Sequence, residues 1–368
     1  MRIGIDAREI CRPNTGIGKY VSNLVRCLAL IDNENQYVLF VESDRFPLPF
    51  SLPANFQLMQ VWPRGHRNIQ SQLALPLLQS RARVDLFHAT HHDAAPLLGT
   101  AKMVLTVHDI APIDLQDFPL LHRQCYALLS WGVTHRAAAV ISVSQFTQKR
   151  LVAWNTAAKT KSTVVYEAAD EYYPDEDPSK WERLGKRFGL RGRYVLYVGS
   201  LARRKNLKGL LRSIPTVKSL CSDIQFVVVG IASGRADYSL SADEEGQVIR
   251  IHGGLSVDEM RLLYACAEVM VFPSFYEGFG LPVLEAMACG CPVVTSRTSS
   301  LPEIVGAAGI LIEPFDNDAI SAAIVSVLND PSLRKQMRND GIARAAKFSW
   351  ERMAQETLTV YRSAFASK

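Results

Sequence analysis

Long hydrophobic segments are missing from this sequence of 368 residues. No apolar run reaches the roughly 20 residues that a membrane-spanning helix needs, and the charged start, Met1 to Asp6, does not resemble a secretory signal peptide. The content of hydrophobic residues (48%) and charged residues (21%) is that of an ordinary globular protein. We therefore expect a cytoplasmic protein with two domains, because a domain typically has roughly 100 to 200 residues.

Paired cysteines are also lacking. The seven cysteines are scattered and odd in number, unlike the dense disulfide framework of a small secreted domain. Cys289 and Cys291 form the only close pair, and no second Cys or His pair stands beside them in the sequence to complete a metal site. We expect reduced thiols in the core and a tight turn at residues 289–291.

A strong charge of one sign is absent too. Residues 1–168 carry 17 Lys and Arg against 12 Asp and Glu, whereas residues 169–368 carry 24 of each. The positive excess lies in the first half, where it suits a phosphate-bearing ligand or an anionic membrane, or is simply solvated. So modest an excess, without a recognised motif, disfavours nucleic-acid binding.

Short β-rich runs alternate with segments of helical length along the chain, which predicts parallel sheets covered by helices on both faces. The runs lie at residues 2–6, 37–41, 84–88, 103–107, 140–143, 194–198, 226–229, 269–272, 292–295 and 309–312.

The alternation stops twice. The charged stretch from Asp170 to Arg193 interrupts it, and only helix-like segments follow residue 312, the last of them at residues 350–365. We therefore predict an α/β protein with four parts: a Rossmann-like domain at 1–168, a connector at 169–193, a second Rossmann-like domain at 194–348, and a terminal helix at 349–368 that packs back on the first domain.

Residues 272–295 carry the clearest chemical signal, a strand-like run followed by a glycine loop and a short helix. Gly278 and Gly280 let the backbone approach a ligand closely, and the start of the helix offers amides to an anion. We expect Glu285 in the first turn of this helix, placed to accept hydrogen bonds from ligand hydroxyls. A phosphate bound by these amides, next to a ribose bound by the carboxylate, favours a nucleotide as the ligand. The alternative is an ordinary strand–turn–helix in which the glutamate only caps the helix.

Glu277 and Glu285 form a Glu-x7-Glu pattern that begins with Glu-Gly-Phe-Gly-Leu-Pro at residues 277–282. This pattern resembles the donor site of the retaining glycosyltransferases of family 4, and the resemblance extends over the whole chain. It implies the GT-B fold, in which two Rossmann-like domains face an interdomain cleft. It also implies that Glu277 orients the donor sugar, that Glu285 holds the ribose, and that the donor contacts Gly278, Phe279, Gly280 and Leu281.

A second strand-to-helix junction, at residues 197–211, contains Arg204 and Lys205, with Asn206 as a candidate helix cap. Two cations at such a junction suit a diphosphate, although a loop of this kind is more often merely solvated. The resemblance implies that Arg204 and Lys205 hold the donor diphosphate. Some family members have Gly-Arg at the end of this strand, with the arginine at the position of Ser200 in this chain. We count Ser200 among the donor-binding residues.

The loop expected at residues 14–20 matches neither a Walker motif nor Gly-x-Gly-x-x-Gly. It resembles the N-terminal glycine loop of the family, whose backbone lies across the cleft from the donor phosphates. The resemblance therefore assigns Gly16 to the donor site, with Gly18 as a turn-forming residue.

His108 and Asp109 end a strand-like run, and ligands of open α/β sheets bind at the carboxyl ends of strands. In the family the equivalent histidine contacts the donor sugar and the reaction centre, which implies a catalytic His108. We expect His91 and Asp109 to face the acceptor. A zinc site at residues 88–93 is disfavoured, because His91 and His92 are adjacent and point in different directions in an extended chain.

The resemblance implies transfer of a hexose from a nucleotide-diphosphate sugar to a hydroxyl of a glycan or a polyprenyl-diphosphate-linked acceptor, with retained anomeric configuration. We expect no cofactor and no essential metal, since enzymes of this kind generally need none. Val-His-Asp-Ile-Ala-Pro at residues 107–112 resembles bacterial mannosyltransferases of surface polysaccharide assembly, so GDP-mannose is the first expected donor and a UDP-sugar the alternative. A sugar-nucleotide epimerase and a nucleotide-sugar binding protein are the competing functions.

Peripheral contact with the inner face of the cytoplasmic membrane is a further expectation. Residues 62–67 and the apolar residues 73–78, which Arg81 and Arg83 follow, suit an anionic lipid surface. An ordinary core helix and loop is the alternative.

Overall fold

The computed structural model describes residues 1–12, 15–42, 48, 50–63, 69–175, 177–230 and 239–367. The chain forms two compact units, the first from Met1–Glu167 with Ser349–Lys368 and the second from Ala168–Phe348. Each unit contains one parallel sheet with helices around it. The predicted α/β class with two Rossmann-like domains is therefore confirmed, and so is the return of the last helix to the first domain.

The first sheet has the strand order β3-β2-β1-β4-β5-β6-β7. Its strands are β1 (Arg2–Asp6), β2 (Gln36–Val41), β3 (Phe56–Gln60), β4 (Leu86–Ala89), β5 (Lys102–Val107), β6 (Ala139–Ser142) and β7 (Ser162–Val164). The chain order reverses between β1 and β4, and such a switch point opens a crevice at the carboxyl ends of the strands.

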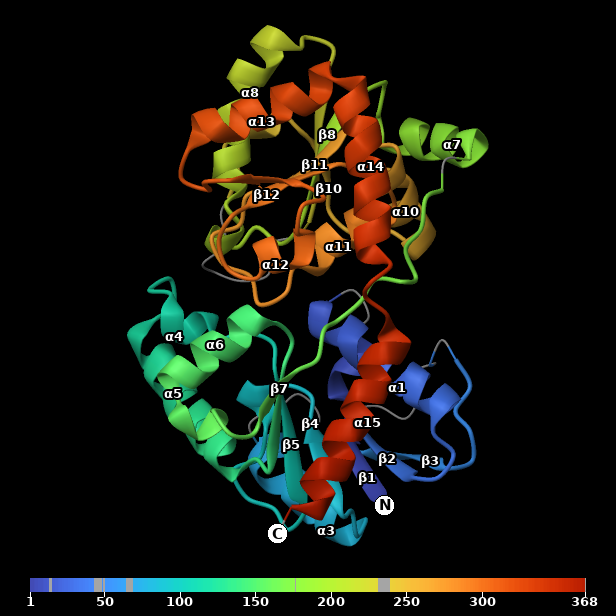
Figure 1. Ribbon diagram of the computed structural model, residues 1–368, viewed down its shortest axis with the longest axis vertical. Coiled ribbons are helices and arrows are strands. Elements are labelled where there is room, and N and C mark those ends of the chain that lie inside the picture. Colours follow the sequence, from blue (N-terminus) through green and yellow to red (C-terminus); the bar gives the residue numbers. More distant parts are fainter. Residues whose placement is uncertain are drawn as a thin grey trace. The chain divides into compact units, whose positions relative to one another are not determined.

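Helices cover both faces of this sheet. Helix α1 (Gly16–Ile31) and the terminal helix α15 (Trp350–Ala366) lie side by side (Figure 1). Three other helices each place an apolar residue, Leu75, Val133 and Leu151, in one core with the sheet; they are α3 (Leu75–Arg81), α5 (Leu120–Arg136) and α6 (Gln145–Trp154). The short α4 (Ala111–Asp114) follows β5. No helix of the described residues is long and apolar enough to cross a bilayer.

The second sheet has the order β10-β9-β8-β11-β12-β13, with its switch point between β8 and β11. Its strands are β8 (Tyr194–Val198), β9 (Gln225–Val229), β10 (Ile249–Ile251), β11 (Val269–Phe272), β12 (Val293–Ser296) and β13 (Ile310–Ile312). The helices of this unit are α7 (Pro178–Phe188), α8 (Leu207–Leu220), α9 (Ala242–Glu245), α10 (Val257–Ala265), α11 (Leu281–Ala288), α12 (Leu301–Val305), α13 (Asn317–Asn329) and α14 (Pro331–Ala345).

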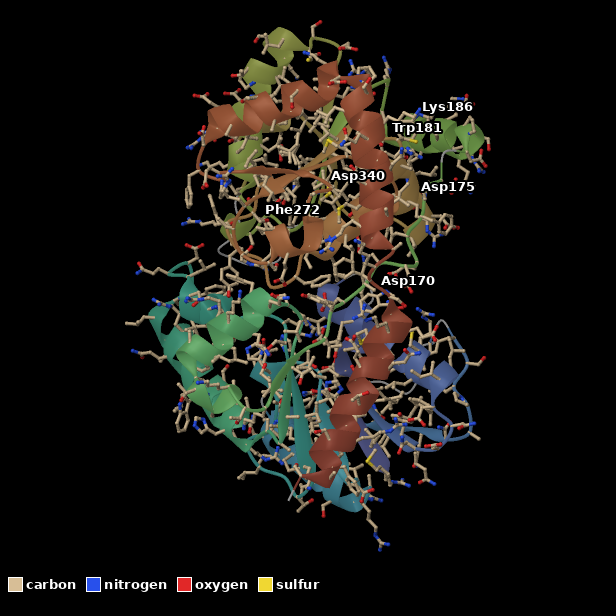
Figure 2. All side chains as sticks on the ribbon, in the orientation of Figure 1. Asp170, Asp175, Trp181, Lys186, Phe272 and Asp340 are labelled. Carbon is tan, nitrogen blue, oxygen red and sulfur yellow. The ribbon has the colours of Figure 1, made fainter. Side chains whose placement is uncertain are left out.

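Helix α7 lies inside the segment expected to be a plain connector, so the prediction missed a helix there. Asp177 caps it by accepting hydrogen bonds from two backbone amides, and Gly189, in a left-handed conformation (φ 70°), ends it. Trp181, marked in Figure 2, stacks on Tyr194 of β8 with ring centroids 5.6 Å apart. This contact attaches α7 to the second sheet.

Candidate active site

An asparagine connects the turn after β8 to neighbouring loops. Asn206 adopts a left-handed conformation (φ 52°), which Asn tolerates better than most residues. Its side-chain amide donates hydrogen bonds to the carbonyls of Pro273 (3.0 Å) and Pro314 (2.7 Å), and its carbonyl oxygen caps α8 by accepting from the Gly209 amide. Because Asn206 bonds the loop after β11, it fixes the preceding cations relative to that loop.

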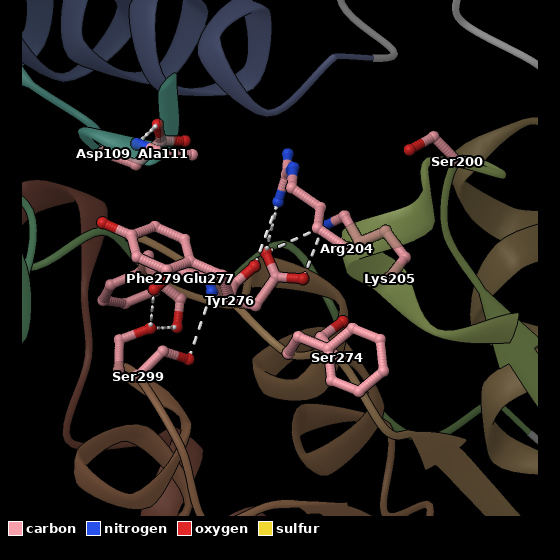
Figure 3. A network of polar contacts seen from close by, with 12 residues as sticks. Asp109, Ala111, Ser200, Arg204, Lys205, Ser274, Tyr276, Glu277, Phe279 and Ser299 are labelled. Atoms are coloured by element: carbon pink, nitrogen blue, oxygen red, sulfur yellow. Dashed lines mark hydrogen bonds and ion pairs between the residues drawn. The ribbon is translucent and has the colours of Figure 1, made fainter. Parts of the chain in front are cut away.

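Arg204 and Lys205 converge on one carboxylate (Figure 3). Lys205 Nζ donates to both oxygens of Glu277 at 2.7 Å. Arg204 lies 3.5 Å from Glu277 Oε2 and donates to the Tyr276 carbonyl at 3.1 Å. The Glu277 side chain is only 6% exposed. Two strands adjacent in the sheet thus bring together residues 72 positions apart in the sequence.

This cluster has two cations and one anion, so it carries a formal charge of +1. A phosphate or diphosphate group suits such a site, because guanidinium and ammonium groups bind phosphate oxygens strongly. Lys205 Nζ also lies 5.1 Å from the centre of the Phe272 ring. Ser200 lies earlier on the same loop, half-buried, and its side chain takes no part in the contacts drawn in Figure 3.

The glycine loop after β11 is shaped by two serines that lie between β12 and α12. The Glu277 amide donates to Ser299 Oγ at 3.1 Å, and the Ser300 hydroxyl lies 3.0 Å and 2.7 Å from the carbonyls of Glu277 and Phe279. Gly280 has φ 110°, and a β-carbon there would meet the Leu301 side chain at 2.9 Å. Only glycine fits this position, where the loop turns into α11.

Glu285 differs from its prediction in one respect. Helix α11 begins at Leu281, so Glu285 lies in the second turn and not the first. Its carboxylate is almost fully buried and accepts a hydrogen bond from the Tyr264 hydroxyl at 2.9 Å. Burial, and then the charge of Glu285, raise the pKa of Tyr264 well above its ordinary value, which keeps this donor protonated. Tyr264 had no signal in the sequence, since it lies on α10.

His108 directly follows β5 in the first unit, and its ring meets two acceptors. Nδ1 is 3.0 Å from Glu167 Oε1, and Nε2 is 3.0 Å from the Thr90 carbonyl. Tyr20 packs edge-on against the ring at 4.9 Å. Burial lowers the pKa of His108, but the hydrogen bond and charge of Glu167 outweigh it, and the pKa is raised overall. Sequence reasoning did not single out Glu167.

Two of the histidines at residues 88–93 lie in the core. His88 is fully buried between the Tyr361 hydroxyl (2.6 Å) and Thr106 Oγ1 (2.7 Å), and burial lowers its pKa to about 3. His92 bonds the Tyr126 hydroxyl, and burial lowers its pKa to about 4. Among the residues that the structure describes, no three His, Cys, Asp or Glu side chains form a group able to hold a metal ion.

The two predicted acceptor-side residues lie near His108. The His91 ring is 6.2 Å from the His108 ring, and its Nδ1 contacts the carboxylate of Asp93. Asp109 Oδ1 accepts a hydrogen bond from the Ala111 amide at 2.9 Å, at the start of α4. The structure therefore brings both residues to the carboxyl end of β5, where Asp109 also has a local structural function.

Gly16 and Gly18 belong to a helix and not to a loop as predicted. Helix α1 begins at Gly16, which is exposed, and Thr15 caps it by accepting from the Gly18 amide at 3.0 Å. A β-carbon on Gly18 would lie 1.9 Å from the Arg12 carbonyl oxygen. Gly18 is therefore required by close packing. Asn14, the first residue of this predicted loop, lies outside the described residues.

Comparison with known proteins places both units in related families. The family described as "Glycosyltransferase Family 4" matches residues 14–171, and "Glycosyl transferases group 1" matches residues 183–344. The O-antigen chain mannosyltransferase B of Escherichia coli is 31% identical over 98% of this chain and 100% of its own length. The MMP alpha-(1->4)-mannosyltransferase of Mycolicibacterium hassiacum is 42% identical over 32% of this chain and 30% of its own.

Solved structures share the fold at low identity. Sucrose-phosphate synthase from Thermosynechococcus elongatus aligns with a TM-score of 0.77 and 20% identity over the whole of both chains. Anabaena HepE in complex with UDP-glucose aligns with a TM-score of 0.74 and 17% identity, over 98% of this chain and 99% of its own. WaaG, a glycosyltransferase involved in lipopolysaccharide biosynthesis, has a TM-score of 0.74 and 18% identity over 97% and 98%.

Proposed function

Because the chain belongs to family 4 of the glycosyltransferases, we propose that it transfers mannose from GDP-mannose to a glycan or a polyprenyl-diphosphate-linked oligosaccharide in bacterial surface polysaccharide assembly, with retention of anomeric configuration. The observation that carries this proposal is the pairing of Arg204 and Lys205 with Glu277 at the switch point of the second sheet. A site with two cations and a carboxylate suits a sugar diphosphate, whose phosphates need positive charge and whose hydroxyls need an acceptor.

In this proposal the residues of the second unit bind the donor. Lys205 and Arg204 hold the diphosphate, with Ser200 at the edge of the site, and the Glu277 carboxylate accepts hydrogen bonds from the sugar hydroxyls. Glu285 holds the ribose, while Tyr264 keeps its carboxylate oriented. The donor also contacts the backbone at residues 278–281, where the first amides of α11 lack acceptors within the helix.

In the first unit, Gly16 at the start of α1 contributes its backbone to the phosphates, and His108 acts at the reaction centre. His91 and Asp109 face the acceptor. The bond between the anomeric carbon and the diphosphate breaks, the acceptor oxygen bonds to the same face of the sugar, and its proton passes to the departing phosphate oxygen. In this scheme the main source of rate enhancement is the fixed positive charge of Lys205 and Arg204, which stabilises the departing diphosphate.

Mannose is favoured over glucose because mannosyltransferases are among the similar proteins, one of them alike over the full length. A UDP-sugar remains the second candidate, because a solved relative of the same fold binds UDP-glucose. An epimerase would release an isomerised nucleotide sugar, whereas a transferase releases the free nucleoside diphosphate and a glycosylated acceptor. Product analysis therefore separates the two reactions.

Ligand-induced thermal stabilisation tests the donor site directly. The full chain is heated with GDP, UDP, dTDP, ADP and their sugar conjugates, with and without EDTA. We expect GDP and GDP-mannose to raise the melting temperature, also in EDTA, and Lys205→Ala to abolish the shift. If only UDP ligands stabilise the protein, its donor is a UDP-sugar and not GDP-mannose. If no nucleotide raises the melting temperature, the assigned donor site is refuted. Loss of the shift in EDTA would refute metal independence.

We also propose peripheral contact with an anionic membrane surface. Part of the predicted contact, residues 64–67, lies outside the described residues. Leu73 and Leu77, one helical turn apart, are 62% and 71% exposed, and residues 118–166 contain no Asp or Glu. Exposed apolar side chains followed along the chain by the exposed Arg81 and Arg83 favour anionic lipid. Sedimentation with phosphatidylglycerol vesicles but not phosphatidylcholine vesicles is the expected result, and equal binding to both would contradict it.

A further inference from the structure

The hydrogen bonds of the His108 ring define where its protons are. The Thr90 carbonyl is only an acceptor, so Nε2, 3.0 Å away, must carry a proton. On the other side of the ring Nδ1 is 3.0 Å from Glu167 Oε1. Without a proton between them, a nitrogen lone pair would face a carboxylate oxygen. The geometry therefore requires one further proton on the His108–Glu167 pair.

That proton belongs on the ring. Histidine ordinarily binds a proton with a pKa near 6.5 and glutamate with one near 4.3, a gap of about two units that favours imidazolium and carboxylate over two neutral groups. The two side chains are 13% and 4% exposed, so water competes little for either. Burial strengthens such a charge-assisted hydrogen bond.

Other titratable groups near His108 influence its charge less directly. The Asp109 carboxylate favours the protonated ring, whereas a positive charge on His88 or His92 would oppose it. His91 lies with its ring 6.2 Å from that of His108. Burial keeps His88 and His92 neutral, and the buried Tyr20 hydroxyl bonds Thr106 and not His108. Glu167 is thus the one carboxylate that bonds the ring among the described residues.

We infer that Glu167 is a positioning residue that holds His108 as an imidazolium, with both ring N–H groups committed to acceptors of the protein. His108 then neither takes the acceptor proton nor donates one, and it contributes an oriented, fixed charge. Glu167 is also the last residue of the first of the two segments that form the first unit, so the pair anchors the chain where it first leaves that unit. Only the placement of His108 at a reaction centre rests on the proposed function.

Nitrogen-15 NMR of the histidine-labelled full chain tests this inference without any substrate. His108→Gln identifies the His108 signals by their loss. In the wild type we expect both ring nitrogens to show N–H shifts and to titrate above free histidine. Glu167→Gln keeps an acceptor oxygen but removes the charge, so the His108 signals should titrate at lower pH. Asp109→Asn is the matched control, and it should move the titration much less.

A pH profile then tests the consequence for turnover. With GDP-mannose as the donor, we expect Glu167→Gln to lose activity at alkaline pH and to regain it on acidification, because low pH restores the imidazolium. A merely structural residue would give a loss that pH does not reverse. A His108 ring with one N–H in the wild type, or a titration unchanged in Glu167→Gln, would overturn the inference. If the NMR results are as expected but GDP-mannose gives no turnover, that outcome counts against GDP-mannose as the donor and not against the role of Glu167.

Discussion

Replacing Lys205 with methionine removes the group that contacts both oxygens of Glu277. A carboxylate that is 6% exposed then keeps only Arg204, 3.5 Å away, as a cationic partner in the cluster. Removing one member of a buried ion pair typically costs roughly 3–5 kcal/mol. Because Arg204 retains part of the attraction, we expect the lower end, about 3 kcal/mol of unfolding free energy.

Two measurements follow from this substitution. For a unit of this size about 1 kcal/mol corresponds to roughly 2–4 °C, so the melting temperature of Lys205→Met should fall by about 6–12 °C. Loss of a charge-assisted hydrogen bond to phosphate, worth roughly 1.5–3 kcal/mol, should also weaken GDP binding by about 10- to 150-fold in calorimetry.

A second substitution separates the two effects. Adding Glu277→Gln to Lys205→Met removes the buried charge, so most of the lost melting temperature should return. The affinity for GDP should stay low, because the phosphate contact is still missing. An unchanged melting temperature in Lys205→Met would show that the pair contributes no stability. Recovered GDP affinity in the double variant would refute direct contact between Lys205 and the phosphates.

Three further changes have defined outcomes. Tyr264→Phe removes a hydrogen bond to the buried Glu285, which should cost about 2 kcal/mol of stability and weaken GDP binding but not pyrophosphate binding. Gly18→Ala places a β-carbon 1.9 Å from the Arg12 carbonyl, so thermal unfolding should show a loss of about 1–3 kcal/mol or more. Burial lowers the pKa of His88 to about 3. The neutral His88 ring therefore contributes to stability above the ordinary histidine pKa of about 6.5. This contribution is lost as the pH falls from 6.5 towards 3, by up to about 1.4 kcal/mol per pH unit.

Each of these has a control. Gly246→Ala places its β-carbon at ordinary contact distances of 3.5 Å or more and should leave thermal stability unchanged; an equal loss in both glycine variants would contradict the packing argument. For His88, denaturant unfolding of His88→Gln should show a weaker pH dependence below pH 6.5. Equal slopes would contradict a buried neutral ring. If Tyr264→Phe weakened pyrophosphate and GDP equally, Glu285 would not be specific for the ribose.

Most of the fold was predictable because the central strands are buried on both faces. The run at residues 194–198 is β8 and the run at 269–272 is β11, each with unbroken apolar character. The three strands missed, β3, β7 and β10, all lie at sheet edges and are partly exposed. An edge strand has one free side and needs fewer apolar residues, so its pattern is weak.

Local hydrogen bonds were also readable from the sequence. Asn206 caps α8 as predicted, and Gly290 follows α11 with φ 75°, because caps depend on neighbouring residues only. Helix α7 had comparable signals in Asp177 and Gly189, but the surrounding charges obscured them.

The sequence by itself determined the two-domain α/β architecture, the glycosyltransferase family and the residues at the carboxyl ends of β5, β8 and β11. It did so because strand burial, helix capping and a short motif are properties of consecutive residues. Only the tertiary structure decided which side chains pair: Lys205 with Glu277 across 72 residues, His108 with Glu167 across 59, and Tyr264 with Glu285 across 21. These pairings arise where neighbouring elements of the chain pack together, which no local pattern encodes.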